Sequence, residues 1–226
     1  MARTTLDPRQ RKSISHSRLI AGWLAILAAF VALGVYAGTR TSPGLDLEIA
    51  RAVQRLPSFA GSALDVANFL GGGWPSGSIT ALFALAFLLE RRPLEAVLFG
   101  LTGVPRFMQS LVKELVEAPR PRVDQLHVQH ILGSYSYPSG HVVGATVVWG
   151  LAFALAPLLP IGPRGVVALR CLCVVMIVAM GLARIWAGAH WPTDVTGGYL
   201  FGVLWLIPEF WLYRRWRQRD EAAPAS

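Results

Sequence analysis

The chain consists largely of apolar runs, each long enough to cross a lipid bilayer as a helix. A spanning helix needs about 20 predominantly apolar residues. The charged residues stand in short blocks between these runs, and apolar residues make up 54% of the chain. A soluble domain of this length is expected to carry more charge. The sequence therefore predicts an all-α, polytopic membrane protein that forms one compact helical unit.

Six spanning helices are predicted from these runs and the breaks between them. The first run follows a basic segment, as in a signal peptide, but its length and the further runs favour a retained helix. The spans are expected at about Leu19–Gly38, from the Gly71-Gly72-Gly73 break to about Leu89, and at about Leu94–Leu111, Val142–Leu159, Val166–Leu182 and Val195–Leu212.

A short amphipathic helix is predicted over residues 44–56, between the first two spans. Apolar residues recur there at helical spacing, with charged residues between them, so one face is apolar and the other is polar. Such a helix is expected to lie on the membrane surface. The apolar positions are Leu45, Ile49, Ala52, Val53 and Leu56.

The basic residues predict which segments face the cytoplasm, because cytoplasmic loops carry an excess of Lys and Arg. Both termini are expected inside, in a bacterial-type inner membrane. The inside segments are then 1–18, 90–93, 160–165 and 213–226, and the outside segments are 39–75, 112–140 and 183–194. The expected organisation is a basic segment 1–18, a six-helix domain 19–213 and a basic tail 214–226.

The net charge of +8 does not indicate nucleic-acid binding. The basic residues flank apolar runs, and no known nucleic-acid-binding motif occurs. This placement is typical of membrane topology and of attraction to anionic lipid. We therefore expect the bilayer and a lipid as partners, and no nucleic acid.

Three short segments, 113–121, 138–141 and 184–194, lie within the predicted outside regions, and the first and third carry cations suited to phosphate. Lys113 and Arg120 stand in the first segment, and Arg184 begins the third. A phosphate ester carries up to two negative charges, and its transfer is catalysed mainly by positioning and charge stabilisation. Arginine also binds phosphate oxygens in a bidentate manner. These three residues are the predicted phosphate-binding cations.

The second segment is Pro138-Ser139-Gly140-His141, directly before the fourth span. Backbone N–H groups at a helix N-terminus point at an anion, and glycine permits close approach. Ser139 and Gly140 are therefore also predicted to bind phosphate, with the Ser139 hydroxyl as a further donor. His141 is predicted to be the general acid that protonates the leaving alcohol and then activates water.

His190 and Asp194 are predicted to form the nucleophilic pair. They are four residues apart, and so share a helix face if the last helix begins near them. Asp194 is expected to accept a hydrogen bond from His190 Nδ1, which leaves Nε2 free to attack phosphorus and stabilises the cationic ring. Neither a metal nor another cofactor is expected, because the cations neutralise the phosphate.

Two further questions are whether the histidines bind zinc and what Arg106 does. Zinc would need ligands such as His127, His130, His141 and His190, but no HExxH or Cys-His spacing occurs. Arg106 lies inside an apolar run, where an arginine is a functional candidate. It either lines the cavity below the phosphate or pairs with a carboxylate such as Glu114.

Together the three segments resemble the type 2 phosphatidic acid phosphatase (PAP2) superfamily, whose pattern is KxxxxxxRP, PSGH and SRxxxxxHxxxD. The pattern runs from Lys113 to Asp194 in order and with the same internal spacing, and Ala183 replaces the first serine of the third motif. The resemblance implies a six-helix fold, a metal-independent phosphohistidine mechanism and an extracytoplasmic active site. Vanadium haloperoxidases share these motifs but are soluble, so the apolar runs argue against them.

The expected function is therefore hydrolysis of a lipid phosphate or diphosphate at the outer face of the membrane. The substrate is expected to be a polyprenyl diphosphate, phosphatidylglycerol phosphate, phosphatidic acid or a lipid A phosphate. Residues 122–137 and 44–56 are expected to set the preference among them. Two other hypotheses are phosphate transfer to another lipid and non-catalytic binding or movement of an anion or lipid.

Overall fold

The structure is a computed structural model that describes residues 8–41 and 44–222. All regular secondary structure within these two ranges is helical, which confirms the all-α prediction. The α-helices are α1 (Pro8–Thr39), α2 (Gly44–Gln54), α3 (Ser58–Leu70), α4 (Gly73–Leu89), α5 (Pro93–Gly100), α6 (Gly103–Val116), α7 (Gly140–Leu155), α8 (Gly162–Trp186) and α9 (Pro192–Ala222). A short 3-10 turn, η1 (Ala156–Leu158), follows α7.

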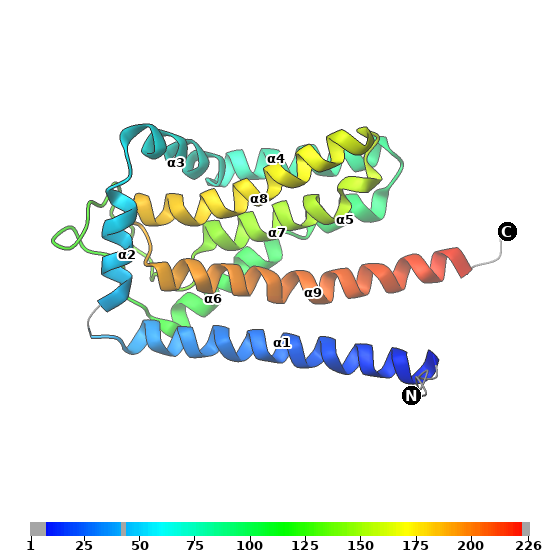
Figure 1. The fold of residues 1–226 in the computed structure, drawn as a ribbon, viewed down its shortest axis with the longest axis horizontal. Helices are drawn as coiled ribbons and strands as arrows, with labels where there is room; N and C mark the ends of the chain where they lie inside the picture. Colours follow the sequence, from blue (N-terminus) through cyan, green and yellow to red (C-terminus); the bar gives the residue numbers. More distant parts are fainter. Residues whose placement is uncertain (1–7, 42–43, 223–226) are drawn as a thin grey trace, which may run out of the picture.

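Helix α7 lies at the centre of the bundle and packs against α8 and α9 (Figure 1). In its apolar window 61% of the residues are buried, whereas α1 at the periphery has 11%. Helix α1 packs along α9, and α3 packs on α8. The described ends of α1 and α9 lie at one end of the bundle with the α4–α5 and α7–α8 connections, and α2 crosses the other end (Figure 1). The segments predicted to lie inside are thus together, apart from residues 1–7 and 223–226, which lie outside the described residues.

Within the described residues, four helices are long and apolar enough to span a membrane: α1, α7, α8 and α9. Helices α3 and α4 make a fifth candidate if they are one broken span, bent by 69° at the glycine break. The predicted count of six is therefore not confirmed. The predicted third span is missing in either case, and the predicted second span is missing as well unless α3 and α4 are one span.

Residues 94–111 form two short helices, α5 and α6, instead of the expected single span. Pro105 cannot donate a backbone hydrogen bond to Leu101, and its ring would clash with that carbonyl in a continuous helix. The Leu101 carbonyl accepts the Val104 N–H at 3.0 Å instead, in a tighter turn. Gly100 and Gly103 weaken the helix further. The break is consistent with this local sequence.

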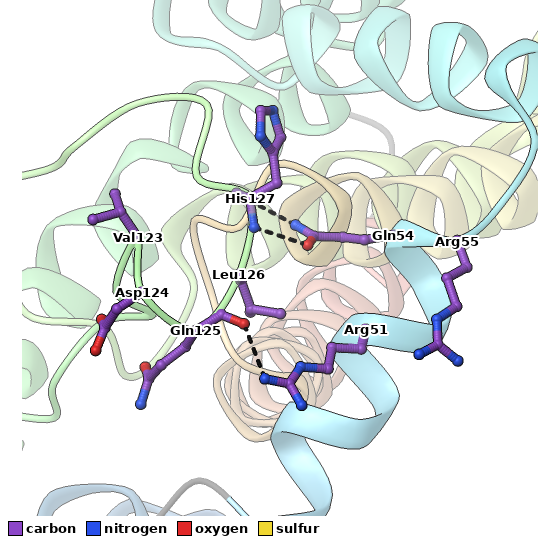
Figure 2. Close-up of a pocket in the computed structure, with 8 residues that line it drawn as sticks. All are labelled: Arg51, Gln54, Arg55, Val123, Asp124, Gln125, Leu126 and His127. Atoms are coloured by element: carbon purple, nitrogen blue, oxygen red, sulfur yellow. Dashed lines mark hydrogen bonds between the residues drawn. The ribbon is translucent and has the colours of Figure 1, made fainter.

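The predicted amphipathic helix is present as α2, which ends two residues before the expected boundary. Its apolar residues Leu47, Ala50 and Val53 pack toward Trp191. Its polar side bonds to the long loop that joins α6 and α7 (Figure 2): the Gln54 amide donates to the His127 carbonyl at 2.7 Å and accepts the His127 N–H at 3.1 Å. Helix α2 therefore fastens this loop to the bundle.

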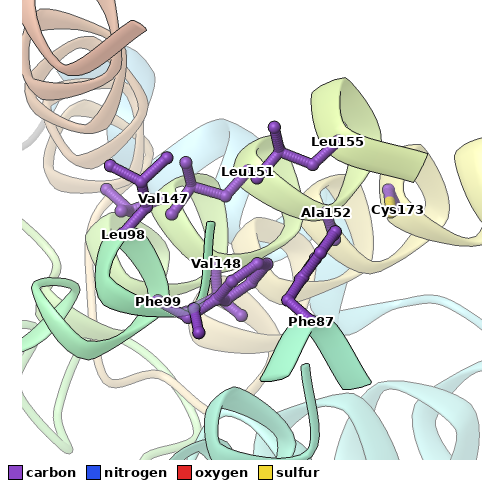
Figure 3. Packing of buried hydrophobic residues seen from close by; sticks show 10 residues of the cluster. Phe87, Leu98, Phe99, Val147, Val148, Leu151, Ala152, Leu155 and Cys173 are labelled. Carbon is purple, nitrogen blue, oxygen red and sulfur yellow. The ribbon is translucent and has the colours of Figure 1, made fainter. Parts of the chain in front are cut away.

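The largest apolar core lies among α4, α5, α7 and α8 (Figure 3). Phe99 is fully buried and stacks between Phe83 and Phe87, at centroid distances of 5.2 and 5.7 Å. Leu151 and Leu155 of α7 fill the space beside them. This cluster fixes α7, and so fixes the position of the helix start at Gly140.

Candidate active site

The three predicted motifs meet at the α2 end of the bundle. Arg120 lies in the loop between α6 and α7, Gly140 begins α7, and His190 lies in the short connection between α8 and α9. The backbone joins two of these segments directly, since the Ser139 N–H donates to the Asp194 carbonyl at 3.0 Å. Residues far apart in the sequence therefore share one site.

His190 is almost completely buried, with 2% of its surface exposed. Its Nε2 lies 3.3 Å from Arg120 Nη1, and its backbone N–H donates to the Arg184 carbonyl at 3.3 Å. Gly188 makes this turn possible: it has a φ of +63°, and a Cβ there would lie 2.1 Å from the His127 carbonyl oxygen. The backbone thus directs the His190 ring toward Arg120.

Asp194 lies behind His190 in the first turn of α9 and is fully buried. Its Oδ2 accepts the Trp191 N–H at 2.8 Å and the hydroxyl of Ser136. The distance from Asp194 Oδ2 to His190 Nδ1 is 3.6 Å, and the Ser136 hydroxyl lies 3.3 Å from the same nitrogen. The expected direct hydrogen bond is therefore replaced by an ion-pair contact with Ser136 between the two groups. His190 also precedes α9, so the pair is not formed on one helix face.

The three predicted cations surround this pair without a carboxylate partner within 4.0 Å among the described residues. Arg120 donates to the carbonyls of Ser134 and Ala189, each at 2.6 Å, and Lys113 donates to the Tyr135 carbonyl at 2.7 Å. Buried cations are costly unless paired. An anion bound among these cations would offset that cost.

Arg184 occupies the other wall of the site, with 5% of its surface exposed. Its guanidinium donates to the Asn68 side chain, and its Nε has no hydrogen-bond partner in the described part of the chain. The Asn68 contact holds the guanidinium toward α3. An anion that approaches from this side would meet an unsatisfied donor.

Burial and neighbouring positive charges lower the pKa of both His190 and Lys113. Burial, followed by the positive charges of Arg120 and Arg184, holds the pKa of His190 well below its usual range. Burial and then Arg120 lower the pKa of Lys113 to about 8. A neutral imidazole has a free lone pair with which it can attack. A bound anion would stabilise the protonated form of the lysine.

His141 lines a cavity of about 350 Å³ between the α3–α4 bend and the α8–α9 connection. Arg184 lines it as well, and so does Ala189, which directly precedes His190 in the chain. Phe69, Trp74 and other apolar residues form much of the remaining wall. The cavity thus joins the cation-rich site to an apolar surface.

Ser139 and Gly140 lie at the start of α7, as predicted. The Ser139 hydroxyl is buried and has no hydrogen-bond partner in the described residues. A Cβ on Gly140 would lie 3.1 Å from the Gln109 amide, so the helix start is closely packed. An unpaired hydroxyl beside a helix N-terminus is an arrangement that favours an anion.

Arg106 does not pair with Glu114, which is exposed. Its Nη2 donates to the Ser76 hydroxyl at 2.7 Å, across from α6 to α4. A Cβ on Gly144 would lie 2.3 Å from the guanidinium, so a larger residue at this position of α7 would displace Arg106. Arg106 thus links three helices one turn below Gly140 and His141.

The four histidines considered as zinc ligands do not form a metal-like group. In the described ranges no three His, Cys, Asp or Glu side chains are arranged to hold a metal ion. His127 bonds through its backbone to Gln54, and His130 lines the cavity beside His141.

Sequence reasoning missed Ser136, Arg40 and Asp46, all of which contact the nucleophilic pair or its helix. Ser136 stands in the polar loop without a motif of its own. Arg40 carried a signal, because a basic residue at the outer end of the first span runs against the positive-inside pattern.

These features define a polytopic helical membrane protein with a buried, cation-rich site around a neutral histidine. The family model described as PAP2 superfamily matches residues 94–219, more than half of the chain. The chain therefore belongs to the PAP2 superfamily.

Two curated relatives are similar over part of the chain. Phosphatidylglycerophosphatase B of Bacillus subtilis is 32% identical over 103 residues, which are 45% of this chain and 49% of the relative. The bacitracin transport permease protein BcrC of Bacillus licheniformis is 33% identical over 94 residues, which are 42% of this chain and 40% of the relative. The matched region thus spans half or less of each relative.

Two solved structures share the fold. A transmembrane PAP2-type phosphatidylglycerolphosphate phosphatase from Bacillus subtilis superposes with a TM-score of 0.70 at 23% identity, over 83% of this chain and 94% of that chain. LpxE from Aquifex aeolicus superposes with a TM-score of 0.54 at 22% identity, over 71% of this chain and 92% of that chain. The fold is therefore that of a transmembrane PAP2 protein.

Proposed function

We propose that the protein hydrolyses a phosphate monoester or diphosphate of a membrane lipid through a phosphohistidine on His190. The observation that carries this proposal is the arrangement of His190. Its Nε2 faces Arg120 at 3.3 Å, and its Nδ1 faces Asp194 and Ser136. Among the described residues, no carboxylate lies within 4.0 Å of the three predicted cations around it. An anion site built around a neutral nucleophile suits phosphoryl transfer better than simple binding.

In the first step, His190 Nε2 attacks phosphorus and the bond from phosphorus to the leaving oxygen breaks. His141, which lies beside Arg184 on the cavity wall, gives its proton to that oxygen. The positive charge that develops on His190 is stabilised by Asp194 at 3.6 Å. The products of this step are the lipid alcohol, or a lipid monophosphate if the substrate is a diphosphate, and phosphohistidine.

In the second step, water attacks phosphorus while His141 takes up one of its protons. The bond from phosphorus to Nε2 breaks, which releases inorganic phosphate and restores neutral His190. Lys113, Arg120 and Arg184 stabilise the charge on the phosphoryl oxygens in both steps. The Ser139 hydroxyl and the N-terminus of α7 add donors from the other side. No step uses a metal or another cofactor.

The lipid character of the substrate is supported by the cavity beside His141. It leads from Arg184 to Phe69 and Trp74 on the α3–α4 bend, and Trp74 is 75% exposed on the outer surface of the bundle. A lipid can keep its tail in the bilayer while its phosphate enters the site along this path. The relatives named phosphatidylglycerophosphatase B and LpxE add support for a lipid phosphate.

The candidate substrates are polyprenyl diphosphate, phosphatidylglycerol phosphate, phosphatidic acid and a lipid A phosphate. The proposed setting is the inner membrane of a bacterium, with both termini in the cytoplasm and the site on the outer face. The bonds between α2 and the 122–137 loop (Figure 2) support the proposal that these two segments set the preference among headgroups.

The test is phosphate release from these four lipids by the purified protein in detergent, with a chelator present. We compare the wild type with His190→Ala and with His127→Ala, a matched loop histidine whose backbone bonds to α2. We expect release by the wild type and by His127→Ala and none by His190→Ala. Activity in His190→Ala would contradict the nucleophile assignment, and loss of activity on chelation would contradict the metal-free mechanism.

The products of the same assay separate the two other hypotheses. Transfer of the phosphate to a second lipid, without free phosphate, would indicate a phosphotransferase. Retention of every lipid unchanged would indicate a protein that binds or moves an anion or lipid.

A further inference from the structure

Two buried charges outside the three motifs connect the N-terminal helices to the site. Arg40 follows α1 and Asp46 lies in the first turn of α2, and their side chains form an ion pair with 3% and 6% exposure. Both residues lie outside residues 94–219, which the family model matches. Burying an ion pair costs desolvation energy that the pair alone seldom recovers, so the further contacts of each member matter.

Asp46 caps the N-terminus of α9. Its Oδ1 accepts the backbone N–H of Thr193 at 2.9 Å and the Thr193 hydroxyl at 2.8 Å, and the same hydroxyl lies 2.6 Å from Oδ2. The first N–H groups of a helix have no partner within the helix and favour a carboxylate. Asp46 therefore fixes, from another helix, the turn that carries Asp194.

Arg40 faces Asp194 with its other nitrogen. Arg40 Nη2 lies 4.0 Å from Asp194 Oδ1, and its guanidinium lies 5.1 Å from the centroid of the Trp191 ring. Neither Nη2 nor Oδ1 has a hydrogen-bond partner among the described residues, so each is the charge that the other faces. Asp194 Oδ2, in contrast, faces His190.

We propose that Arg40 is a positioning residue for phosphoryl transfer, which keeps Asp194 ionised and holds the first turn of α9 through Asp46. The inference rests on the proposed role of His190 as nucleophile. Asp194 stabilises the cationic ring of His190 only while it carries a negative charge. Arg40 supplies the opposite charge on the far side of that carboxylate, without touching the substrate.

The charges around Asp194 explain why Arg40 matters. Asp46 and Asp194 are both buried carboxylates, and Arg40 lies between them. Without Arg40, two like charges would face each other, and one of the two would take up a proton at a higher pH. The charged and titratable groups that face Asp194 are Arg40 after α1, Asp46 on α2, Lys113 on α6, Arg120 and Tyr137 in the loop, and His190 before α9. His141 on α7 and Arg184 on α8 face His190 instead.

The test measures kcat and KM against pH for the full chain in detergent, with the panel lipid that the wild type hydrolyses fastest. In Arg40→Gln we expect kcat to fall on the order of 10–100-fold, as for other residues that orient a catalytic group, with little change in KM. The acidic limb of the kcat profile moves up by about one pH unit, because Asp194 loses its ionised state sooner. Arg40→Lys keeps the positive charge, so its acidic limb should lie close to that of the wild type.

Asp46→Asn separates positioning from simple folding. The amide oxygen still caps Thr193, while the competing carboxylate is gone, so Arg40 serves Asp194 alone and the acidic limb moves to lower pH. This variant decides the matter if Arg40→Gln does not fold. The proposal would be overturned if both variants lost the same amount of folded protein and the acidic limb of the kcat profile moved in neither. A kcat in Arg40→Gln equal to that of the wild type would also overturn it. An inactive wild type would instead refute the proposed function.

Discussion

The two ends of the bundle are stabilised by different means, although the same helices α7, α8 and α9 run through both. At the end that holds the start of α1 and the end of α9, Phe99 stacks between Phe83 and Phe87. Leu151 belongs to the same cluster as Phe87 and Phe99 (Figure 3). At the other end, several of the buried groups are charged, and Lys113 and Arg120 donate to backbone carbonyls.

The comparison teaches where stability and chemistry reside. Burial of apolar side chains stabilises the apolar end at little cost in desolvation energy. The site end keeps Lys113, Arg184 and Asp194 in a position that costs desolvation energy. Substitutions at the apolar end should therefore lower the stability of the fold and leave the activity intact. Substitutions at the site end should lower the activity and leave the stability intact.

The largest effect is expected from Asp194→Asn. The amide preserves the shape but removes the charge that stabilises cationic His190, so kcat should fall by roughly 10³–10⁴-fold, as for the corresponding change in a serine protease triad. The melting temperature in detergent should not fall, because a costly buried charge is removed. The matched control is Asp124→Asn, at an exposed position. A stability loss as large as the activity loss would break the comparison.

His141→Gln is expected to come next. Loss of a general acid typically costs about 10²–10⁴-fold in rate. The loss should be smaller with an aryl phosphate, whose leaving group needs no proton, than with a lipid phosphate. His130→Gln alters the same cavity and serves as the control. Equal losses with both leaving groups would show that His141 does not act as the acid.

At the apolar end, Leu151→Ala should lower stability and leave the chemistry intact. Leu151 is fully buried, and such a truncation typically costs about 2–5 kcal/mol. Thermal melting measures the loss, and kcat well below the melting temperature should match the wild type. Leu172→Ala, at a position that is 46% exposed, should change neither quantity much. A fall in kcat for Leu151→Ala would show that packing at the apolar end affects the chemistry, which would contradict the comparison.

The smallest effect concerns the pH dependence of substrate binding. Burial lowers the pKa of Lys113 to about 8, so the free protein has this charge below that pH and loses it above. KM should therefore rise as the pH passes 8, while kcat changes less, because bound phosphate keeps the lysine protonated. Lys113→Arg should move the rise in KM to higher pH. A KM that stays constant across pH 8 in the wild type would contradict this role.

The sequence predicts the long helices well, and it predicts that His190 and Asp194 lie close together. Apolar runs and basic flanks are local signals, and they correctly place α1, α7, α8 and α9. Motif spacing likewise identifies His190 and Asp194, whose contact follows from only four residues of chain. These features depend on nearby residues, which a single sequence displays.

The rest depends on tertiary contacts. Pro105 and two glycines break the predicted third span, but their effect competes with an apolar pattern that reads as continuous. Ser136 reaches His190 only because the loop folds back over the site. The capping of α9 by Asp46 joins residues that are 147 positions apart. No local pattern reports such contacts.

The most direct test of the account is to trap the covalent intermediate. The protein is mixed with a ³²P-labelled lipid phosphate, quenched within the first turnover and digested, and the labelled peptide is identified by mass spectrometry. We predict an acid-labile, base-stable label on His190, absent from His190→Ala and retained in His127→Ala. A label on another residue, or labelled inorganic phosphate formed in the first turnover without any labelled protein, would contradict the phosphohistidine mechanism.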